Sequence, residues 1–553
     1  MDFKSVNKLF QAQFTANWDR PALTKYKSNT LFYKDVAQLI AKIHIMFEEC
    51  GVEKGDRVAM CSRNQANWAV CFLAATTYGA VPVPLLHEFK PANIHHLVNH
   101  SEAKVLFVGD GIWDGLSESE MPDLKAIILI NDFSLIYSSS EKITETRNHL
   151  NELFGKKYPK DFTPECLDYY EDSADELAMI NYTSGTSGFS KGVMIPYRAI
   201  FSNITFAWKV LPNLNYESKV VSMLPMAHMY GLMFEVLFEL SIGAHIYFLT
   251  RLPSPKVIMQ ALADVKPDLV VAVPLIIEKV YKSKLKPIIE KEGIKFMLKL
   301  PVLNQVVTKK IREELISAFG GRFTEVIIGG AAFNKEVESF LKKIDFPYTV
   351  GYGMTECAPI ISYDGWRTNQ LYSCGKTAPN MTIKIASSDP ENVPGEVLIK
   401  GMNVFLGYYK NEEATSEAFT EDGWFRTGDM GVMDKEGYLY LRGRSKCMIL
   451  GPSGQNIYPE EIENSINAMQ YVVESLIIED KGSLVALIYP DFPAAEKDGM
   501  KEAELEKFLR GLIADVNKDL PNYSRIKDIE LMPEDFERTP KKSIKRYLYQ
   551  RNK

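Results

Sequence analysis

Cysteine is scarce and scattered in this sequence. Seven cysteines occur among 553 residues, and no two of them have the CxxC spacing of a zinc site or a redox motif. This pattern excludes a disulfide framework and a zinc cage built from cysteine pairs, and it is typical of proteins from a reducing compartment. We therefore expect a cytoplasmic protein.

The sequence also lacks a large excess of charge of one sign. The 64 lysines and arginines are balanced by 71 aspartates and glutamates, which leaves a net charge of -7. A basic field that would select nucleic acid as the main partner is therefore absent from the composition. A small anionic ligand needs only a local positive site, so we expect small-molecule substrates and no nucleic acid partner.

Long apolar runs are rare as well. Residues 1–20 lack the basic start, apolar stretch and cleavage site of an export signal. One stretch, 68–86, is uncharged over about the ~20 residues that a membrane helix needs. Gly79, Pro82 and Pro84 interrupt it, which predicts a buried helix followed by a short buried strand. We expect no transmembrane segment.

The length of the chain predicts more than one domain, because a single hydrophobic core rarely grows beyond ~250–300 residues. Short β-branched runs such as 56–60 and 103–108 alternate with longer helical patterns, which predicts layered α/β sheets with mainly parallel strands. After about residue 394, short strands between glycine-rich turns indicate a small β subdomain. We predict a large N-terminal domain over residues 1–445 and a small α+β C-terminal domain over residues 446–553.

The most informative segment is a run of small residues after a predicted buried strand, 176–182. It consists of Thr183, Ser184, Gly185, Thr186, Ser187, Gly188, Phe189, Ser190, Lys191 and Gly192. Small side chains let backbone N–H groups converge on an anion, hydroxyl groups add donors, and Lys191 adds a charge that can follow a moving pyrophosphate. The glycine spacing differs from that of the GxxxxGK[ST] loop. A flexible surface turn is the alternative, but ten residues in this order favour a phosphate-binding loop.

At this point the sequence resembles the adenylate-forming superfamily, which includes acyl-CoA synthetases, firefly luciferase and the adenylation domains of peptide synthetases. The resemblance covers nearly the whole chain, with weaker early matches at 55–58 and 79–84. It implies a mobile phosphate-binding loop at 183–192, an AMP-binding adenylation domain and a mobile C-terminal domain. The overall pattern is most similar to bacterial long-chain fatty acid–CoA ligases.

A second motif follows the strand-like segment 347–350 and contains Tyr352, Gly353, Thr355 and Glu356. A hydroxyl and a carboxylate on one tight turn can hold Mg²⁺ and a phosphate oxygen together, because Mg²⁺ prefers one or two carboxylates plus phosphate and water. The resemblance implies that Glu356 is the metal ligand, that Thr355 contacts the α-phosphate and that Tyr352 stacks on adenine. For a Thr–Glu pair alone, a helix cap is the alternative.

Two further turns are expected to bind the nucleoside. Gly330, Ala331 and Ala332 leave a smooth strand end where a flat purine can lie, with close packing of a strand against a helix as the alternative. Asp429 is an acceptor-only side chain on a glycine turn, which suits chelation of two ribose hydroxyls. The resemblance implies the same two roles, adenine binding and ribose binding.

The resemblance also indicates a hinge and an acyl passage. It makes Arg444 a second ribose or phosphate contact and Lys446 the pivot between the domains; an exposed charged turn is the alternative. A pivot is required if one site assembles two reactions around a retained intermediate. His228 has a family counterpart beside the acyl pocket and is expected to contribute to the acyl and thiol passage, although a lone histidine is more often structural.

One position departs from the family pattern. The family usually supplies, near its C-terminus, a lysine that bridges the acyl carboxylate and the ribose during adenylation, and Ser543 stands there in this chain. Lys542 and Lys545 are close neighbours, but a shift of one residue on a strand turns the side chain to the opposite face. Three explanations stay open: Lys542 or Lys545 substitutes through a local bulge, adenylation is slow, or the chain has lost adenylation while retaining binding.

Together the motifs predict an enzyme that uses ATP and Mg²⁺ to form an acyl-adenylate and passes the acyl group to CoA, releasing AMP and pyrophosphate. Apolar segments at 232–240 and 274–280 indicate a hydrophobic acid, with aryl and medium-chain acids as alternatives. A free acyl carrier protein is the alternative acceptor, and a non-catalytic acyl- or nucleotide-binding protein is the alternative to an enzyme. The basic tail leaves peripheral contact with an anionic membrane open.

Overall fold

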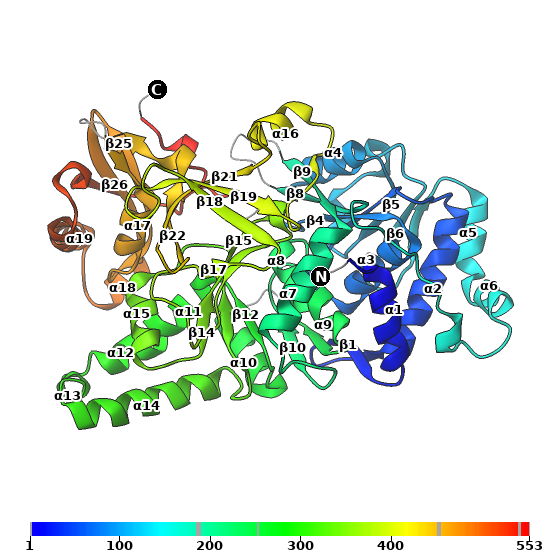
Figure 1. The fold of residues 1–553 in the computed structure, drawn as a ribbon, viewed down its shortest axis with the longest axis horizontal. Coiled ribbons are helices and arrows are strands. Elements are labelled where there is room, and N and C mark those ends of the chain that lie inside the picture. The colour runs from blue at the N-terminus through cyan, green and yellow to red at the C-terminus, as the bar shows by residue number, and fades with distance from the viewer. Residues whose placement is uncertain (1–2, 184–189, 251–253, 451–454, 540–542, 552–553) are drawn as a thin grey trace.

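The computed structural model describes residues 3–183, 190–250, 254–450, 455–539 and 543–551. The molecule is elongated, with the N-terminal sheets at one end and a smaller C-terminal unit at the other (Figure 1). The predicted fold class, layered α/β sheets with a small β subdomain and a small α+β unit, is confirmed. The boundary between residues 445 and 446 stays a prediction.

The first sheet has five strands in the order β4-β3-β5-β6-β7, and its neighbours are parallel except for β6 and β7. The strands are β3 (Arg57–Cys61), β4 (Val81–Leu85), β5 (Ala103–Val108), β6 (Ala126–Leu129) and β7 (Leu135–Ser138). Helices α2 (Tyr33–Glu49) and α3 (Ala66–Tyr78) pack against each other and share one hydrophobic core with this sheet. The predicted helix and strand within 68–86 are therefore confirmed as α3 and β4.

Proline is tolerated in β4 because this strand lies at the edge of its sheet. A proline cannot donate to a partner strand, so Pro82 and Pro84 fit where only one neighbour, β3, is paired. Gly79 ends α3 with a positive φ of 87°, a conformation that glycine adopts without steric penalty. Among the described helices, none is both long and apolar enough to cross a membrane.

Two smaller sheets follow, and they are mostly parallel. The order β10-β11-β1-β2 is built from β1 (Pro21–Lys25), β2 (Thr30–Phe32), β10 (Lys219–Ser222) and β11 (His245–Phe248). The order β12-β13-β14 is built from β12 (Val270–Ala272), β13 (Val326–Ile328) and β14 (Tyr348–Val350), all parallel. Because carboxyl ends of parallel strands meet at one edge, the turns after β13 and β14 lie close together.

The helices around these sheets are α1 (Val6–Ala16), α4 (Pro91–Ser101), α5 (Glu141–Asn148), α6 (Leu150–Lys157), α7 (Tyr197–Val210), α8 (Met229–Leu232), α9 (Phe238–Ser241), α10 (Pro255–Val265), α11 (Pro274–Val280), α12 (Lys286–Ile289), α13 (Glu292–Met297), α14 (Pro301–Ala318) and α15 (Lys335–Lys343). The helices α1, α2, α3 and α7 contribute to one core, whereas α10, α11, α14 and α15 contribute to a second. The helices thus pack against the sheets in two separate hydrophobic cores.

The strands on either side of the glycine-rich loop pair in the antiparallel sense. The strand β8 (Leu177–Thr183) pairs with β9 (Lys191–Pro196), and β9 pairs with β20 (Gly407–Tyr408). The β subdomain predicted after residue 394 contains β18 (Met381–Ala386), β19 (Gly395–Gly401), β21 (Phe425–Met433) and β22 (Leu439–Arg444) in one antiparallel sheet. A smaller antiparallel sheet contains β15 (Tyr352–Gly353), β16 (Ile360–Tyr363) and β17 (Lys376–Thr377). The predicted parallel arrangement therefore holds for the central sheets and not for these.

The C-terminal unit has a hydrophobic core of its own. Its elements are β23 (Ile449–Leu450), β24 (Asn456–Ile457), α17 (Pro459–Asn467), β25 (Val472–Asp480), β26 (Ser483–Pro490), α18 (Phe492–Lys497), α19 (Glu502–Asp519) and β27 (Ile526–Leu531). The buried side chains of this core come from residues 457–529. It is an α+β unit, as the sequence indicates.

Polar contacts join the C-terminal unit to the body of the molecule through α17. Arg442 pairs with Glu461 at 3.1 Å, Lys282 donates to the Asn467 carbonyl, and Asn334 donates to the Asn464 carbonyl at 3.1 Å. Among the described residues, the junction thus includes an ion pair and two bonds to backbone carbonyls.

Candidate active site

The glycine-rich loop begins and ends at neighbouring positions of a hairpin. Thr183, the last residue of β8, is paired directly with Lys191, the first residue of β9, and its Oγ1 donates to the Lys191 carbonyl at 3.4 Å. The predicted phosphate contacts Ser184, Gly185, Thr186, Ser187 and Gly188 lie outside the described residues. The structure thus places both ends of the loop side by side, at the end of the β8–β9 hairpin.

Tyr408 connects the end of this loop to Glu356. The Lys191 ammonium lies 4.7 Å from the centre of the Tyr408 ring, and the Tyr408 hydroxyl donates a hydrogen bond of 3.0 Å to Glu356 Oε1. Tyr408 reaches this place because β20 pairs with β9, with Tyr408 opposite Val193. Sequence reasoning missed Tyr408, since no local signal reveals a pairing across more than two hundred residues.

Glu356 is nearly buried, with 8% of its surface exposed, in the short 3-10 turn η6 (Thr355–Cys357). Burial, followed by the nearby Glu356 charge, raises the pKa of Tyr408, so its hydroxyl keeps its proton and donates. One buried carboxylate, whose tyrosine partner also contacts Lys191, fits Mg²⁺ that shares its remaining positions between nucleotide phosphate and water. No cluster of three or more metal-ligating side chains occurs in the described parts of the chain, and such an ion does not need one.

Asp429, Arg444 and Tyr352 form the second group of the site. Asp429 of β21 and Arg444 of β22 are directly opposite each other, and Arg444 Nε lies 2.8 Å from Asp429 Oδ1. The Tyr352 hydroxyl donates to the other carboxylate oxygen, Oδ2. Burial raises the pKa of Asp429, while the Arg444 charge opposes this rise. The carboxylate is therefore fixed in orientation by two donors.

Arg444 has room to move, because 53% of its side chain is exposed, whereas Asp429 is buried. A ribose diol arriving at Asp429 can thus exchange with the arginine without disturbing the core. Tyr352, expected to stack on adenine, is buried and shares Asp429 with the arginine. The structure brings these three residues together.

The turn after β13 presents Gly330, Ala331 and Ala332 at the surface, and Gly330 has a positive φ of 87°. At the preceding Gly329, an added Cβ would lie 3.3 Å from the Tyr230 ring, so a larger residue would press on that ring. The Tyr230 hydroxyl donates to a backbone carbonyl of β13 at 3.1 Å. This strand end is smooth and open, with one aromatic wall.

His228 caps the start of α8 and lies close to the loop strand β8. Its backbone amide donates to the Pro225 carbonyl at 2.9 Å, and Asn181 of β8 donates to the Ala227 carbonyl at 2.9 Å. The histidine is half-buried. The turn that holds it is thus attached to the same strand that delivers the phosphate loop.

The apolar segment 232–240 is buried, as expected, but it also buries two glutamates. It passes from α8 through the π-helical turn η4 (Met233–Leu237) into α9. Glu235 accepts hydrogen bonds from two backbone amides, whereas Oε1 of Glu239 has no partner among the described residues. Burial raises the pKa of Glu239 to about 8.

The proposed hinge comes directly after Arg444 in the chain, whereas the described C-terminal lysine, Lys545, makes its contact elsewhere. Lys446 is exposed in η7 (Ser445–Cys447). Lys545 pairs with Glu537 at 2.9 Å within the C-terminal unit rather than with Glu356 or Asp429. Lys542 lies outside the described residues, and Ser543 is exposed. The structure therefore leaves the position of the adenylation lysine as a prediction.

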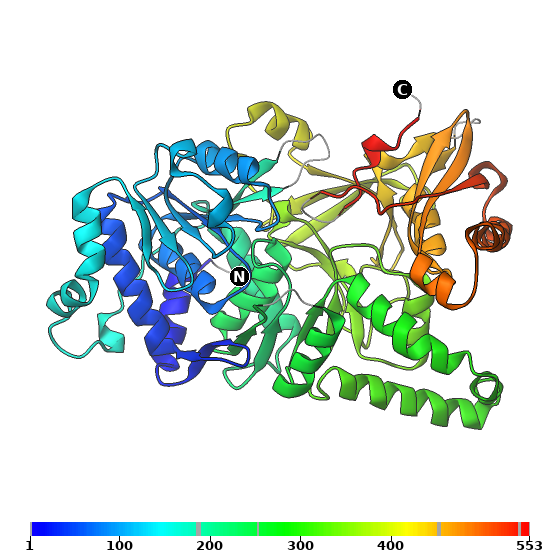
Figure 2. The ribbon, with the colours of Figure 1, turned by 180° about the vertical axis from the view of Figure 1, so that it is seen from behind.

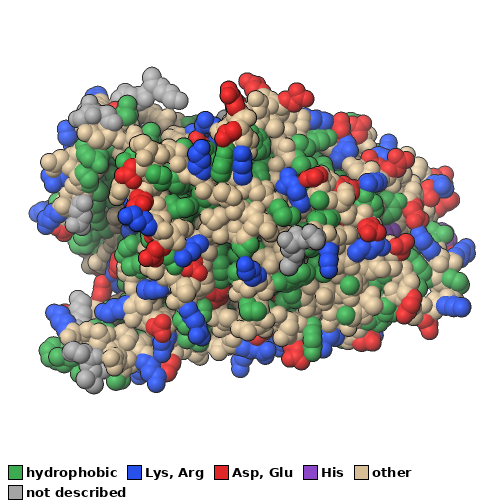
Figure 3. Space-filling view, in the orientation of Figure 1, with side chains coloured by type: hydrophobic (Ala, Val, Ile, Leu, Met, Phe, Trp, Pro, Cys, Tyr) green, Lys and Arg blue, Asp and Glu red, His purple; other side chains and the backbone are tan. Residues whose placement is uncertain are grey.

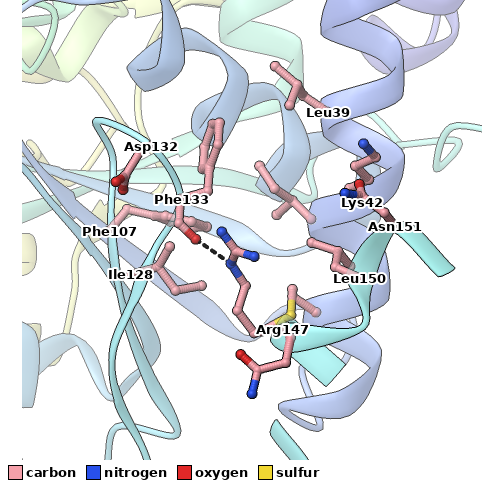
Figure 4. Close-up of a pocket in the computed structure, with 12 residues that line it drawn as sticks. Leu39, Lys42, Phe107, Ile128, Asp132, Phe133, Arg147, Leu150 and Asn151 are labelled. Atoms are coloured by element: carbon pink, nitrogen blue, oxygen red, sulfur yellow. Dashed lines mark hydrogen bonds between the residues drawn. The ribbon is translucent and has the colours of Figure 1, made fainter. Parts of the chain in front are cut away.

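A separate cavity of about 190 Å³ lies at the other end of the molecule, between α2, the first sheet and the helices α5 and α6 (Figure 4). Arg147 points into it and donates from Nε to the Phe133 carbonyl at 2.6 Å. Apolar side chains such as Phe107 and Ile128 form its floor, and Lys42 stands at its edge. The residues of the candidate site do not line this cavity.

Comparison with known proteins identifies the family. Residues 10–409 match the model of the AMP-binding enzymes, and residues 448–552 match the model of the AMP-binding enzyme C-terminal domain. The chain belongs to the AMP-binding enzyme family. The resemblance to adenylate-forming enzymes is thereby confirmed, and the two matches agree with the two parts of this AMP-binding enzyme.

Curated relatives and solved structures cover nearly all of the AMP-binding enzyme. The long-chain-fatty-acid–CoA ligase FadD15 of Mycobacterium bovis is 26% identical over 546 residues, which covers 90% of this chain and 86% of that protein. The anthranilate CoA ligase AuaEII in complex with anthranoyl-AMP has a TM-score of 0.78 and 18% identity, covering 99% of this chain and 97% of its own. O-succinylbenzoate CoA synthetase (MenE) of Bacillus subtilis, in complex with ATP and magnesium, has a TM-score of 0.74 and 20% identity, covering 98% of each chain. The two structures show the shared fold.

Proposed function

We propose that this AMP-binding enzyme activates an apolar carboxylic acid, a long-chain fatty acid foremost, with ATP and transfers the acyl group to CoA. The observation that carries the proposal is the contact of one tyrosine, Tyr408, with both Lys191 and Glu356. The lysine at the end of a phosphate loop and the carboxylate that would hold Mg²⁺ must act on the same triphosphate. Their common neighbour supports a single site for both.

In the first step the acid carboxylate attacks the α-phosphate of ATP in line, which forms acyl-AMP and breaks the bond to pyrophosphate. Glu356 would hold Mg²⁺, which would neutralise the charge of the phosphates. Lys191 and the hydroxyls of the loop bind the departing pyrophosphate, and Thr355 orients the α-phosphate. Lys542 or Lys545 bridges the acid and the ribose in place of the lysine that the family usually has where Ser543 stands.

The nucleoside is held by the second group of the site. Asp429 accepts from the two ribose hydroxyls, and Arg444 turns from Asp429 toward ribose or phosphate. Tyr352 and the exposed turn Gly330–Ala331–Ala332 hold the adenine. The Asp429 carboxylate is buried and is held by two donors, Arg444 and Tyr352. This supports the role, because a fixed acceptor loses little freedom when ribose binds.

In the second step the thiol of CoA attacks the acyl carbonyl of acyl-AMP, which releases AMP and forms the thioester. We place the hinge at Lys446, so that residues 446–553 rotate against residues 1–445 between the two steps. His228 lies where the turn before α8 meets β8, and we assign it to the passage for the acyl group and thiol. A free acyl carrier protein is the alternative acceptor.

The long-chain acid is supported by the sequence relative, whose own name gives long-chain fatty acids. The aromatic ring of Tyr230 beside Gly329 supports an apolar environment at the strand end. Aryl acids form the alternative class, since AuaEII is named for anthranilate. The scattered cysteines support a cytoplasmic enzyme.

The decisive experiment is ATP–pyrophosphate exchange with Mg²⁺ and a panel of acids from butyrate to stearate, with benzoate and anthranilate added. We expect exchange that depends on the acid and rises with chain length, followed by thioester formation when CoA is supplied. A parallel reaction with acyl carrier protein distinguishes the two acceptors. Absence of exchange with every acid, despite measurable ATP binding, would show a binding protein that has lost adenylation.

A further inference from the structure

A helical segment projects from the body of the molecule at the corner where α13 and α14 lie, at the lower left of Figure 1 and the lower right of Figure 2. We call residues 284–310 the helical projection. It comprises the end of the π-helical turn η5 (Tyr281–Leu285), then α12, α13 and the first half of α14. The second half of α14 anchors it, because Ile311 and Leu315 are buried in the core beneath β12 and β13.

Large apolar side chains are exposed on the helical projection. Their exposed fractions are 37% for Ile288, 63% for Phe296, 38% for Leu300, 39% for Leu303 and 61% for Val306. Leu303 and Val306 are three residues apart on α14 and therefore share one face of the helix. Five such side chains within nineteen residues leave an apolar surface that water solvates poorly, which is typical of an interaction site.

Lysines without ion pairs surround these apolar side chains. Lys284, Lys291, Lys299 and Lys310 are exposed, and in the described parts of the chain none of their ammonium groups has a salt-bridge or hydrogen-bond partner. Lys310 follows Val306 by four residues and lies on the same face of α14. Apolar and basic side chains are intermingled at this corner of the surface (Figure 3).

We propose that the helical projection docks on the surface of an anionic lipid bilayer. Apolar side chains enter the boundary between headgroups and acyl chains, while lysines keep their ammonium groups at the level of the anionic phosphates. A protein partner fits this composition poorly, because lysine is depleted in protein–protein interfaces. The docking does not depend on the function proposed above, since it concerns a surface remote from Glu356 and Asp429.

Vesicle co-sedimentation of the full chain tests the proposal. We expect binding to vesicles of phosphatidylcholine with about a third phosphatidylglycerol, weak binding to phosphatidylcholine alone, and loss of most binding at high salt, where charges are screened. Hydrogen exchange measured with and without vesicles should show protection of residues 284–310. Protection confined to the basic tail after residue 540 would overturn the proposal.

Two pairs of variants separate the apolar and the basic contribution. Phe296→Ser with Val306→Ser should weaken binding more than about tenfold, because two apolar anchors are lost. Lys291→Gln with Lys299→Gln should weaken it about fivefold for each lysine. All four positions are exposed, so the melting temperature should not change.

Matched controls change similar side chains elsewhere on the surface. Val393→Ser removes an apolar side chain that is 49% exposed in the β subdomain, and Lys125→Gln with Lys160→Gln removes two exposed lysines outside the helical projection. These variants should bind vesicles as the unchanged protein does. Equal binding by the controls and the projection variants would overturn the proposal. So would a dimer in light scattering that the Phe296→Ser and Val306→Ser changes dissociate without any vesicle binding, because the partner would then be a second copy.

Discussion

The hydroxyl of Tyr408 donates a 3.0 Å hydrogen bond to Oε1 of Glu356. The same ring lies 4.7 Å from the Lys191 ammonium, so one side chain restrains both groups that we propose to act on the triphosphate. Since β20 and β9 hold this ring in place, the geometry of the site depends on the pairing of β9 with a strand, β20, that is distant in sequence from both motifs.

Changing Tyr408 to Phe removes the hydroxyl and keeps the ring beside Lys191. A hydrogen bond to a charged group is worth ~1.5–3 kcal/mol, so we expect kcat for ATP–pyrophosphate exchange to fall on the order of tenfold. Tyr409→Phe is the matched control, because that hydroxyl donates to Glu102 at 3.1 Å instead. Equal exchange rates for the two variants, measured across a range of Mg²⁺ concentrations, would contradict a role for Tyr408.

Changing Asp429 to Asn removes the charge that accepts from ribose and leaves Arg444 without its partner. We expect the KM for ATP to rise at least about tenfold, which corresponds to ~1.4 kcal/mol of lost binding. Arg426 lies on the same strand as Asp429 and pairs with Glu396 at 2.8 Å. The variant Arg426→Gln breaks that pair and serves as the control. A KM for ATP that stays within twofold of the unchanged enzyme would refute ribose binding by Asp429.

The raised pKa of Glu239 predicts that the stability of the folded protein depends on pH. Burial raises its pKa to about 8 in the folded protein, while the unfolded chain ionises near the ordinary value of about 4.3. Between these values the native state retains a proton that the unfolded state has released, so this group's contribution to stability falls as pH rises through the window. The slope is at most ~1.4 kcal/mol per pH unit for one group.

The variant Glu239→Gln lacks this titration. Its melting temperature, followed by scanning fluorimetry between pH 5 and 8, should therefore decline less than that of the unchanged protein. Glu217→Gln, at an exposed position, provides the control and should follow the unchanged protein. Parallel curves for all three proteins would show that Glu239 does not keep its proton at neutral pH.

Lys545→Ala and Lys542→Ala test which lysine replaces the one expected at Ser543. The variant that removes the bridging lysine should lose exchange by more than about a hundredfold, because a charged contact to the transition state disappears. It should still convert supplied acyl-AMP and CoA to the thioester, since that step does not need this lysine. The ammonium of Lys545 must first leave Glu537, with which it now pairs.

The two single variants serve as controls for each other, measured by exchange and by thioester formation. If both retain exchange, neither lysine takes the bridging role. If both lose thioester formation as well, the changes have damaged the C-terminal unit rather than one chemical step.

Local chemistry made much of the fold predictable. Glycine and proline within 68–86 reveal the break between α3 and β4. Asp429 and Glu356 were singled out by their motifs together with the family resemblance, and their roles stay predictions. Tyr408 was not predictable, because its importance comes from the pairing of β20 with β9. The burial of Glu239 was equally hidden, since a glutamate in a helical pattern ordinarily faces water.

The polar junction at α17 has a consequence for how the enzyme responds to its ligands. An exposed ion pair contributes ~0–1 kcal/mol, and each bond to a backbone carbonyl replaces one to water, so these polar contacts add little free energy in favour of this arrangement. A ligand that binds a rotated arrangement a hundredfold better would gain ~2.7 kcal/mol, enough to make that arrangement predominate. We therefore expect the occupant of the site, rather than these polar contacts, to determine which arrangement is populated.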